Sequence, residues 1–435
     1  MRKLARASGI AAVAVALTLV AAACSSSTGG DSSDSGGPVT LTMWAGTGTE
    51  KVAEEWNKTH PNIQVKAVNV TNGQPATTKL LAAIKAGAGA PDVMGTEYTN
   101  IPTLVASDAL ADLAKVGASE LKSDFSGSMW NAVTLGGESV YGVPGDAGPM
   151  MFYYRKDVLQ KLGLEVPETW AEYAAAAKTI HEKDPSMYLG TFTGADASVF
   201  AGLSQQAGAS WWSADGDAWS VNIDSDASRK VAEYWGGLVQ SGVIDNQPLF
   251  TPSWNSAING GKQVGWISSV WGAGVLAGNA ADTKGKWAAT TLPVWDTASP
   301  TSGNWGGQAW VVTTQSKHPK EAYEFAKWAL TSKDGLTSLV KAVGIYPAAL
   351  NAQGTTDTPP PFLSDQSDFF ALAAKSSEQI PPTTFGPNVN VAYNAYVDEF
   401  GKAAKAKIQA DFLTALSSMQ QTTLNDLKKS GYAVK

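Results

Sequence analysis

The chain has 435 residues, a formal net charge of −7, and a composition that is 44% hydrophobic and 16% charged. This length predicts two or three domains with enough apolar residues for each to bury a core. One cysteine excludes an intrachain disulfide framework, and three dispersed histidines argue against a metal site. The acidic balance argues against a nucleic-acid partner. Sixteen tryptophans are the unusual feature of the composition.

The first residues have the pattern of a secretory leader. Arg2, Lys3 and Arg6 precede an uncharged, alanine-rich stretch over residues 7–23, which is less apolar than a membrane-spanning helix requires. Cys24 follows directly and resembles the lipobox cysteine of bacterial lipoproteins, which is acylated. We therefore expect a signal peptide over 1–23 and a lipidated Cys24 with a flexible Ser/Gly linker over 24–37. The alternative is a secreted protein with an incidental cysteine.

From residue 39 the chain alternates between strand and helix patterns. Strands are predicted at 39–44, 63–70 and in the PDVM stretch, and helices at 50–58, 76–86 and 101–107. Such alternation predicts a parallel sheet, whose ligands gather at the carboxyl ends of the strands. This places Trp44, Glu97 and Tyr98 on the expected binding edge. The AGTGT turn after Trp44 is expected to present helix N-terminal N–H groups to a ligand oxygen.

A different kind of segment begins at residue 141. A turn dense in Gly and Pro runs into the apolar strand MMFYY, which is long enough to pass from one lobe to another. Thr169 and Glu172 form a capping-box pattern that begins a helix reaching about residue 183. Further helices are predicted at 227–240 and 319–330, and residues 391–429 are largely helical in composition.

Five collinear segments carry a resemblance to a known family. They are VTLTMWAG, AGAGAPDV with ASDALADL, YGVPGDAGPMMFYYRKDVLQKLGLEVPETWAEY, NGGKQVGWISSVW, and WGGQAWVVTTQSKHPKEAYEFAKWALTS with GIYPA. Together with the leader, they resemble the extracellular solute-binding lipoproteins of ABC importers, in particular the sugar-binding family that includes maltose-binding protein.

The resemblance implies an α/β fold of two lobes, each a mixed or parallel sheet flanked by helices, with a ligand cleft between them. The first lobe is expected to take residues 38–148 and 291–334, and the second residues 149–290 and 335–435. Hinge crossings are implied near 149–154, 287–292 and 332–336. Closure of such lobes is driven by ligand contacts that exist only in the closed state.

Tryptophan suits sugars, because the C–H face of a pyranose lies flat on an aromatic ring while its hydroxyls need polar partners. Trp44, Trp271 and Trp305 lie beside glycines at strand ends or in loops and are expected to contact ligand. Trp211, Trp212 and Trp254 fit ligand contact and core packing equally. Four tryptophans within helical patterns are assigned to the core: Trp56, Trp170, Trp235 and Trp328.

Several polar residues are further candidates. Asp146 and Glu97 fit either a grip on ligand hydroxyls or a structural role in a turn. Gly306 and Gly307 permit close approach of the backbone to ligand, and Gln308 is a possible donor. By resemblance, Asn388 and Asn390 are cleft residues. Three charged residues are read as structural or surface positions: Asp92, Arg155 and Lys156.

These observations favour a lipid-anchored monomer on the outer face of the cell membrane, which captures a carbohydrate and delivers it to the permease of an ABC importer. No cofactor, metal, nucleic acid or catalytic residue is expected. Two alternatives stay open. A secreted glycoside hydrolase uses the same tryptophan platforms with paired carboxylates. A binding protein for a non-sugar solute such as a polyamine, a peptide or a phosphorylated compound needs a cluster of opposite charges in the cleft, and the named loops contain no arginine.

Overall fold

The computed structural model describes residues 37–46, 48–70, 74–216, 218–343, 345–352 and 358–435. Pro38–Lys435 form one folded unit, described below. The predicted leader, the linker through residue 36 with Cys24, and Thr47 of the AGTGT turn lie outside the described residues. Among the described helices, none is both long and apolar enough to cross a membrane.

A five-stranded sheet is the centre of the first group of elements, called the first lobe. Its order is β2-β1-β3-β10-β4, with β1 parallel to β2 and β3, and β10 antiparallel to β3 and β4. In β1, Leu41 and Met43 are fully buried, as expected from its β-branched and apolar run. The strands are β1 (Val39–Ala45), β2 (Ile63–Asn69), β3 (Val93–Glu97), β4 (Val143–Pro144) and β10 (Gln308–Val312).

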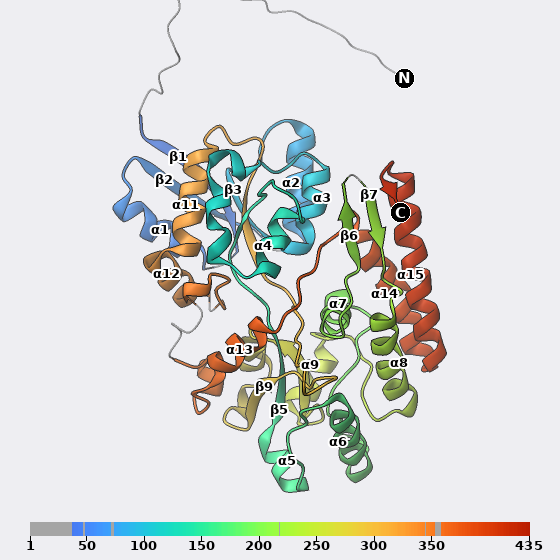
Figure 1. The fold of residues 1–435 in the computed structure, drawn as a ribbon. Helices are drawn as coiled ribbons and strands as arrows, with labels where there is room; N and C mark the ends of the chain where they lie inside the picture. Colours follow the sequence, from blue (N-terminus) through green and yellow to red (C-terminus); the bar gives the residue numbers. More distant parts are fainter. Residues whose placement is uncertain (1–36, 47, 71–73, 217, 344, 353–357) are drawn as a thin grey trace, which may run out of the picture. The chain divides into compact units, whose positions relative to one another are not determined.

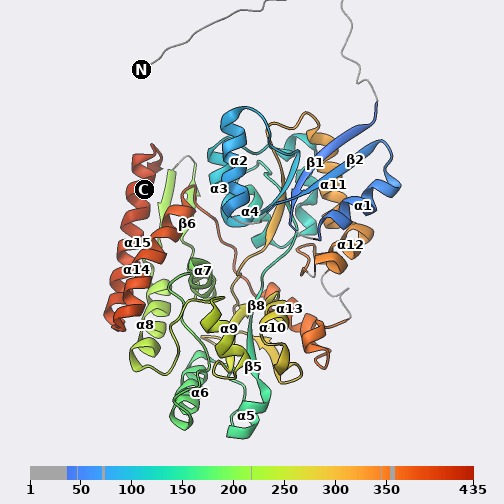
Figure 2. The same ribbon diagram turned by 180° about the vertical axis from the view of Figure 1, so that it is seen from behind.

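Helices cover both faces of this sheet. Figures 1 and 2 show α1, α11 and α12 on one side and α2 and α3 on the other. The helices of this lobe are α1 (Glu50–Thr59), α2 (Gln74–Ala86), α3 (Ile101–Ala106), α4 (Gly127–Thr134), α11 (Pro319–Thr331) and α12 (Lys333–Val343). Three 3-10 turns join them: η1 (Tyr98–Asn100), η2 (Leu113–Val116) and η3 (Ala118–Asp124). The strands and helices predicted between residues 39 and 107 are confirmed.

The second lobe is built on two three-stranded sheets. Strand β5 pairs antiparallel with both β8 and β9, while β7 pairs antiparallel with β6 and parallel with β11. The predicted MMFYY strand is β5, and all but one of its residues are buried. The strands are β5 (Met150–Arg155), β6 (Trp212–Asp215), β7 (Ala218–Val221), β8 (Gly265–Ser269), β9 (Trp287–Thr291) and β11 (Ala433–Val434).

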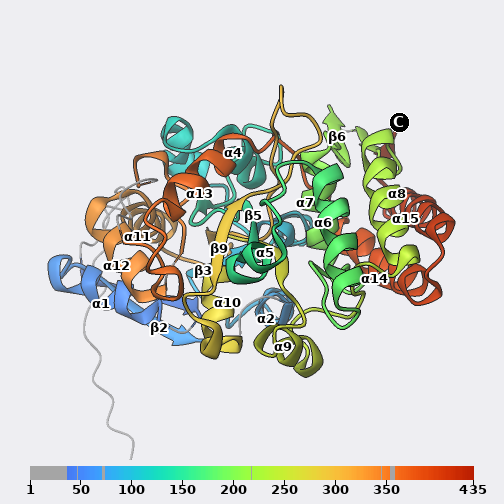
Figure 3. The same cartoon turned by 90° about the horizontal axis from the view of Figure 1, so that it is seen from below.

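Long helices surround these sheets, and α8, α14 and α15 lie side by side (Figure 3). The predicted capping box begins α6: Thr169 Oγ1 accepts from the Glu172 N–H, and the Glu172 carboxylate accepts from the Thr169 N–H. The helices are α5 (Lys156–Leu162), α6 (Trp170–Lys183), α7 (Ala197–Gln206), α8 (Asp226–Ser241), α9 (Pro252–Asn259), α10 (Gly272–Asn279), α13 (Phe369–Glu378), α14 (Val389–Ala406) and α15 (Gln409–Lys429). Shorter turns are η4 (Ala281–Thr283) and η6 (Pro361–Leu363), whereas η5 (Leu350–Ala352) lies against the first lobe, where Asn351 donates to the Thr331 carbonyl at the end of α11.

The chain passes between the two groups of elements at residues 145–149, at 292–307, and again between α12 and α13. Residues 332–336, where the resemblance implied the last crossing, lie at the junction of α11 and α12. Because α12 packs against both α1 and α11, the chain leaves the first lobe only after α12.

Arg155 differs from its expected place on a solvated surface. It ends the central strand β5 opposite Trp287, and its side chain is only 10% exposed. Its guanidinium donates to both carboxylate oxygens of Asp157 at 2.6 and 2.7 Å, which compensates the burial of the charge. Lys156 is more exposed and pairs with Asp365.

Candidate functional site

A hollow of about 770 Å³, including the space at its open mouth, is lined by both lobes and by the crossing segments. We call it the main hollow. The first lobe supplies Glu97, Tyr98, Thr99, Ser128, Met129 and Ala132; the second lobe and the crossings supply Ser198, Ala201, Gly202, Gln205, Ala209, Trp211, Trp212, Asn304, Gly306, Gly307, Thr383, Thr384, Phe385 and Tyr393.

The aromatic side chains of the main hollow come from separate parts of the chain. Trp211 and Trp212 pack edge to face with their ring centroids 6.0 Å apart. The Trp211 indole donates to Ser228 Oγ at 2.9 Å, which fixes the ring. Tyr98 is held by its hydroxyl, which donates to the Asp146 carbonyl at 2.9 Å. These anchored rings give the hollow a mostly apolar wall.

The amide side chains of the main hollow tie its walls together. Gln205 on α7 accepts from the Asn304 N–H at 3.0 Å and donates to the Pro381 carbonyl at 2.6 Å. The Asn304 side chain accepts from the Gly148 N–H at 3.0 Å and donates to the Gly306 carbonyl at 2.8 Å. These bonds join α7 to three connecting segments and fix the crossings next to the hollow.

Glu97 is the acidic side chain of the lining, at the carboxyl end of β3. Its side chain is exposed within the concave site, and the surrounding protein raises its pKa by desolvation, followed by the negative charge of Asp196. Asp196 caps the N-terminus of α7 by accepting from the Ser198 N–H at 2.9 Å, and burial also raises its pKa. The described residues of the lining include no lysine or arginine. The site therefore offers acceptors to a ligand that brings donors.

A second, smaller hollow lies at the edge of the five-stranded sheet. It is lined by Met43, Ala45, Gly46, Thr49, Gly95, Gly145, Asp146, Gln308, Trp310, Leu339, Val343 and Ile345. Asp146 Oδ1 accepts from the Gln308 N–H at 2.9 Å, and an isolated bridge pairs Asp146 with Pro347. Burial is the main cause that raises the pKa of Asp146 to about 7, with a further contribution from the charge of Glu97.

Of the residues expected to bind ligand, the main hollow collects Glu97, Tyr98, Trp211 and Gly307, together with Gly306. The smaller hollow collects Asp146 and Gln308. Asp92 is structural, as predicted: its carboxylate accepts from Thr42 and from the Ser316 hydroxyl.

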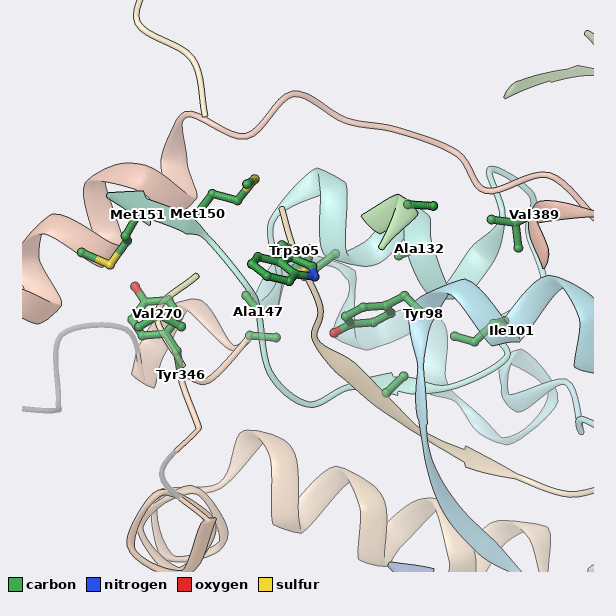
Figure 4. Packing of buried hydrophobic residues seen from close by; sticks show 14 of the residues in the cluster. Tyr98, Ile101, Ala132, Ala147, Met150, Met151, Val270, Trp305, Tyr346 and Val389 are labelled. Carbon is green, nitrogen blue, oxygen red and sulfur yellow. The ribbon is translucent and has the colours of Figure 1, made fainter. Parts of the chain in front are cut away.

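Trp271 and Trp305 lie directly behind the main hollow. Their ring centroids are 4.7 Å apart, and the Trp271 indole donates to the Trp305 carbonyl at 3.0 Å. Trp305 is 5% exposed, and its side chain partly offsets the rise in the pKa of Asp196. Figure 4 shows Trp305 beside Tyr98 and Ala147. The pair supports the wall to which Gly306 belongs.

The other expected residues lie outside both linings. Trp44 is 7% exposed, with the ammonium group of Lys79 4.1 Å from its ring centroid. Trp254 is 1% exposed and packs edge to face on Trp266. Asn388 is buried, and its amide donates to the Thr423 carbonyl at 2.8 Å.

Asn390 donates to Thr103 Oγ1 at 2.8 Å, which ties α14 to α3. Of the four tryptophans assigned to the core, Trp56, Trp170 and Trp235 are buried, as predicted, and Trp328 is half-buried against the same core.

Sequence reasoning missed Asn304, Phe385 and Tyr393 in the main hollow. Asn304 immediately precedes Trp305, so its place in the loop of a candidate residue could have indicated it. Phe385 and Tyr393 lie in a late segment that reaches the hollow only through the fold, and no sequence pattern marks them. The described residues also include no group of three or more His, Cys, Asp or Glu arranged to hold a metal ion.

Comparison with known proteins identifies the family of this chain and solved structures that share its fold. The chain is 24% identical over 440 residues to the arabinooligosaccharide-binding protein of Bacillus subtilis (strain 168), covering 96% of each chain. Among solved structures, the galacto-N-biose-/lacto-N-biose I-binding protein of an ABC transporter from Bifidobacterium longum, in complex with lacto-N-biose, is 28% identical with a TM-score of 0.81. The match covers 93% of this chain and 100% of that one.

A binding protein from B. animalis subsp. lactis Bl-04, in complex with beta-1,6-galactobiose, has the same fold, with 23% identity and a TM-score of 0.77 over 92% of this chain and 100% of that one. These structures confirm the predicted two-lobed α/β fold. The proteins named here are binding proteins rather than enzymes. The model of the bacterial extracellular solute-binding protein family matches residues 45–335. The chain therefore belongs to the bacterial extracellular solute-binding protein family.

Proposed function

We propose that this protein captures a carbohydrate in the main hollow and delivers it to the permease of an ABC importer. The observation that carries the proposal is a hollow between the lobes whose walls are anchored aromatic rings and whose charged group is the carboxylate of Glu97. Aromatic faces suit the C–H face of a sugar ring, and a carboxylate accepts from its hydroxyls. Sugar-binding relatives and neighbours support the assignment.

Thermal unfolding with and without ligand tests the proposal. The panel is arabino-oligosaccharides, lacto-N-biose, beta-1,6-galactobiose and maltotetraose, with a polyamine and a dipeptide as non-sugar arms. A ligand at 100 times its dissociation constant adds about 2.7 kcal/mol of stability. Stabilisation by a sugar and by neither non-sugar is expected. Stabilisation by the amine or the peptide alone contradicts the proposal.

Glu97→Gln sharpens the test, because it keeps the shape of the side chain and removes its charge. We expect at least a tenfold loss of affinity for the stabilising sugar, since a hydrogen bond to a charged group is worth about 1.5–3 kcal/mol. Glu165→Gln, at an exposed position outside the lining, is the matched control and keeps the affinity of the unmodified protein.

The protein acts by binding and release rather than by turnover. Incubation of the purified chain with the stabilising sugar, followed by chromatography of the products, is expected to return the sugar intact. New reducing ends would instead indicate a glycoside hydrolase.

The leader supports a lipid anchor at Cys24 that holds a monomeric protein at the outer face of the cell membrane. Palmitate labelling in cells is expected for the full chain and absent for Cys24→Ser.

The lobes take the predicted limits, 38–148 with 291–334 and 149–290 with 335–435, except that α12 joins the first lobe because it packs on α1.

A further inference from the structure

Phe250 combines two unusual properties. Its side chain is 44% exposed, among the most exposed large apolar side chains of the described residues, and its backbone φ is +61°. For a bulky residue this left-handed conformation is a source of strain. Three other non-glycine residues of the described chain share a positive φ, and all three lie at helix C-terminal ends, where the conformation ends the helix: Asp108, Leu135 and Lys407.

The turn that carries Phe250 is fixed from its C-terminal side. Thr251 donates from its hydroxyl to the Pro248 carbonyl at 3.1 Å and caps α9 by accepting from the Trp254 N–H. The strained residue is therefore held in place by its neighbours. A glycine or asparagine at position 250 relieves the strain, and a polar side chain avoids exposing an apolar ring to water. Stability alone does not favour phenylalanine here.

The Phe250 ring lies over a cluster of four indoles. Its centroid is 5.5 Å from that of Trp254, 6.0 Å from Trp266, and 6.3 Å from both Trp271 and Trp305. The cluster leads back to the main hollow, because a Cβ built on the lining residue Gly306 would lie 3.3 Å from Trp271 Nε1. Phe250 itself does not line the hollow. The Trp271 indole lies between Phe250 and the lining residue Gly306.

We propose that Phe250 is a stacking platform for a further sugar ring, so that the protein takes an oligosaccharide longer than the part of the ligand held in the main hollow. This inference rests on the proposed carbohydrate-binding function. An aromatic residue that is nearly half exposed and rests on other rings offers a flat apolar surface, as the C–H face of a sugar ring requires. The underlying indoles hold that ring in place before ligand arrives.

Affinities for oligosaccharides of two, three and four units test the inference by titration calorimetry. The probes are the arabino-, malto- and beta-1,6-galacto-oligosaccharide series. In the series that binds, Phe250→Ala is expected to weaken binding of the three- or four-unit sugar about 3- to 10-fold, the value of one stacking contact. Binding of the two-unit sugar stays within about twofold. Phe250→Trp keeps the full affinity for the longer sugars.

Leu350→Ala is the matched control, because Leu350 is also 44% exposed and carries no aromatic face. It is expected to leave all affinities unchanged. Phe250→Gly serves as a second variant: it relieves the strain at φ +61° and shows the same length-dependent loss with an undiminished melting temperature.

Equal effects of Phe250→Ala on short and long sugars, or no effect on either, overturn the inference while leaving the proposed function intact. A lower melting temperature in Phe250→Gly with unchanged affinities also overturns it and assigns the ring to packing. If the unmodified protein binds no sugar of the three series, the proposed function fails, and this inference fails with it.

Discussion

Asp146 is expected to make the stability of the protein fall as the pH rises. In the unfolded chain its carboxyl ionises near 3.8, whereas in the folded protein burial, first of all, raises its pKa to about 7. Between these values the folded state holds a proton that the unfolded state has lost. The contribution of Asp146 to the free energy of unfolding therefore decreases from about pH 4 to about pH 7 and is level above that range.

Asp146→Asn isolates this effect, because the amide oxygen still accepts from the Gln308 N–H at 2.9 Å while the charge is gone. A shift of about three pKa units at about 1.4 kcal/mol each sets an upper limit of about 4 kcal/mol. The variant should match the unmodified protein near pH 4. Near pH 8 it should be more stable by up to this amount.

Chemical denaturation followed by tryptophan fluorescence at pH 4.5, 6, 7 and 8 measures the difference. Asp112→Asn is the control of opposite sign. Burial pushes the pKa of Asp112 up, but N–H groups of Val140 and Ala114 and the Ser139 hydroxyl hold it below its usual value. Relative to the unmodified protein, this variant should show its largest loss of unfolding free energy at neutral pH and a smaller loss in acid. A difference between Asp146→Asn and the unmodified protein that is constant with pH would refute the reasoning.

Two further predictions concern packing. Trp254→Ala removes an indole that is 1% exposed, and a loss of about 3–5 kcal/mol of unfolding free energy is expected in a denaturant titration, whereas a loss below about 1 kcal/mol would contradict its place in the core. Gly303→Ala places a Cβ 2.0 Å from the Gly202 carbonyl oxygen, so thermal unfolding should show a lower melting temperature. Gly274→Ala, exposed within α10 with open space around it, should instead gain up to about 1 kcal/mol. Equal effects of the two alanine substitutions would contradict the clash.

The local elements were predictable because their causes are local. The capping box of Thr169 and Glu172 satisfies the first N–H groups of α6 within four residues of sequence, and the structure contains both of its hydrogen bonds. The alternation of strands and helices likewise follows from hydrophobic periodicity. Burial at the ends of elements depends on neighbours far away in sequence. Arg155 illustrates this, because β9 and β8 enclose the end of β5.

The candidate site was predictable only in part. Glu97 and Tyr98 follow directly from the rule that ligands gather at the carboxyl ends of parallel strands. Trp271 and Trp305 were identified by their glycine neighbours, yet the Trp271 indole N–H is already bonded inside the protein and Trp305 is only 5% exposed. A glycine neighbour indicates backbone freedom and carries no information on which face of a ring meets solvent. Tyr393 lines the hollow because α14 packs against α3, although the two helices are nearly 300 residues apart in sequence.

Gly306 and Gly307 were expected to let the backbone approach a ligand, but the closest approach at Gly307 is made by the protein itself. A Cβ there would lie 2.7 Å from the Asp146 carbonyl oxygen and 2.8 Å from the Tyr98 ring. At Gly306 it would meet only the Trp271 indole, at 3.3 Å. Gly307 thus brings the crossing segment against the wall formed by Tyr98.

The two glycines give a matched pair of substitutions. Their φ angles are +89° and +95°, so Gly306→Ala and Gly307→Ala carry similar backbone strain of about 1–3 kcal/mol. Only Gly307→Ala must also displace the Asp146 backbone or the Tyr98 ring, which adds about 1–3 kcal/mol. We expect it to unfold at the lower temperature and to weaken binding of the stabilising sugar more than Gly306→Ala does. Equal losses in the two variants would mean that backbone strain alone selects glycine here and that the contact with Tyr98 does not shape the hollow.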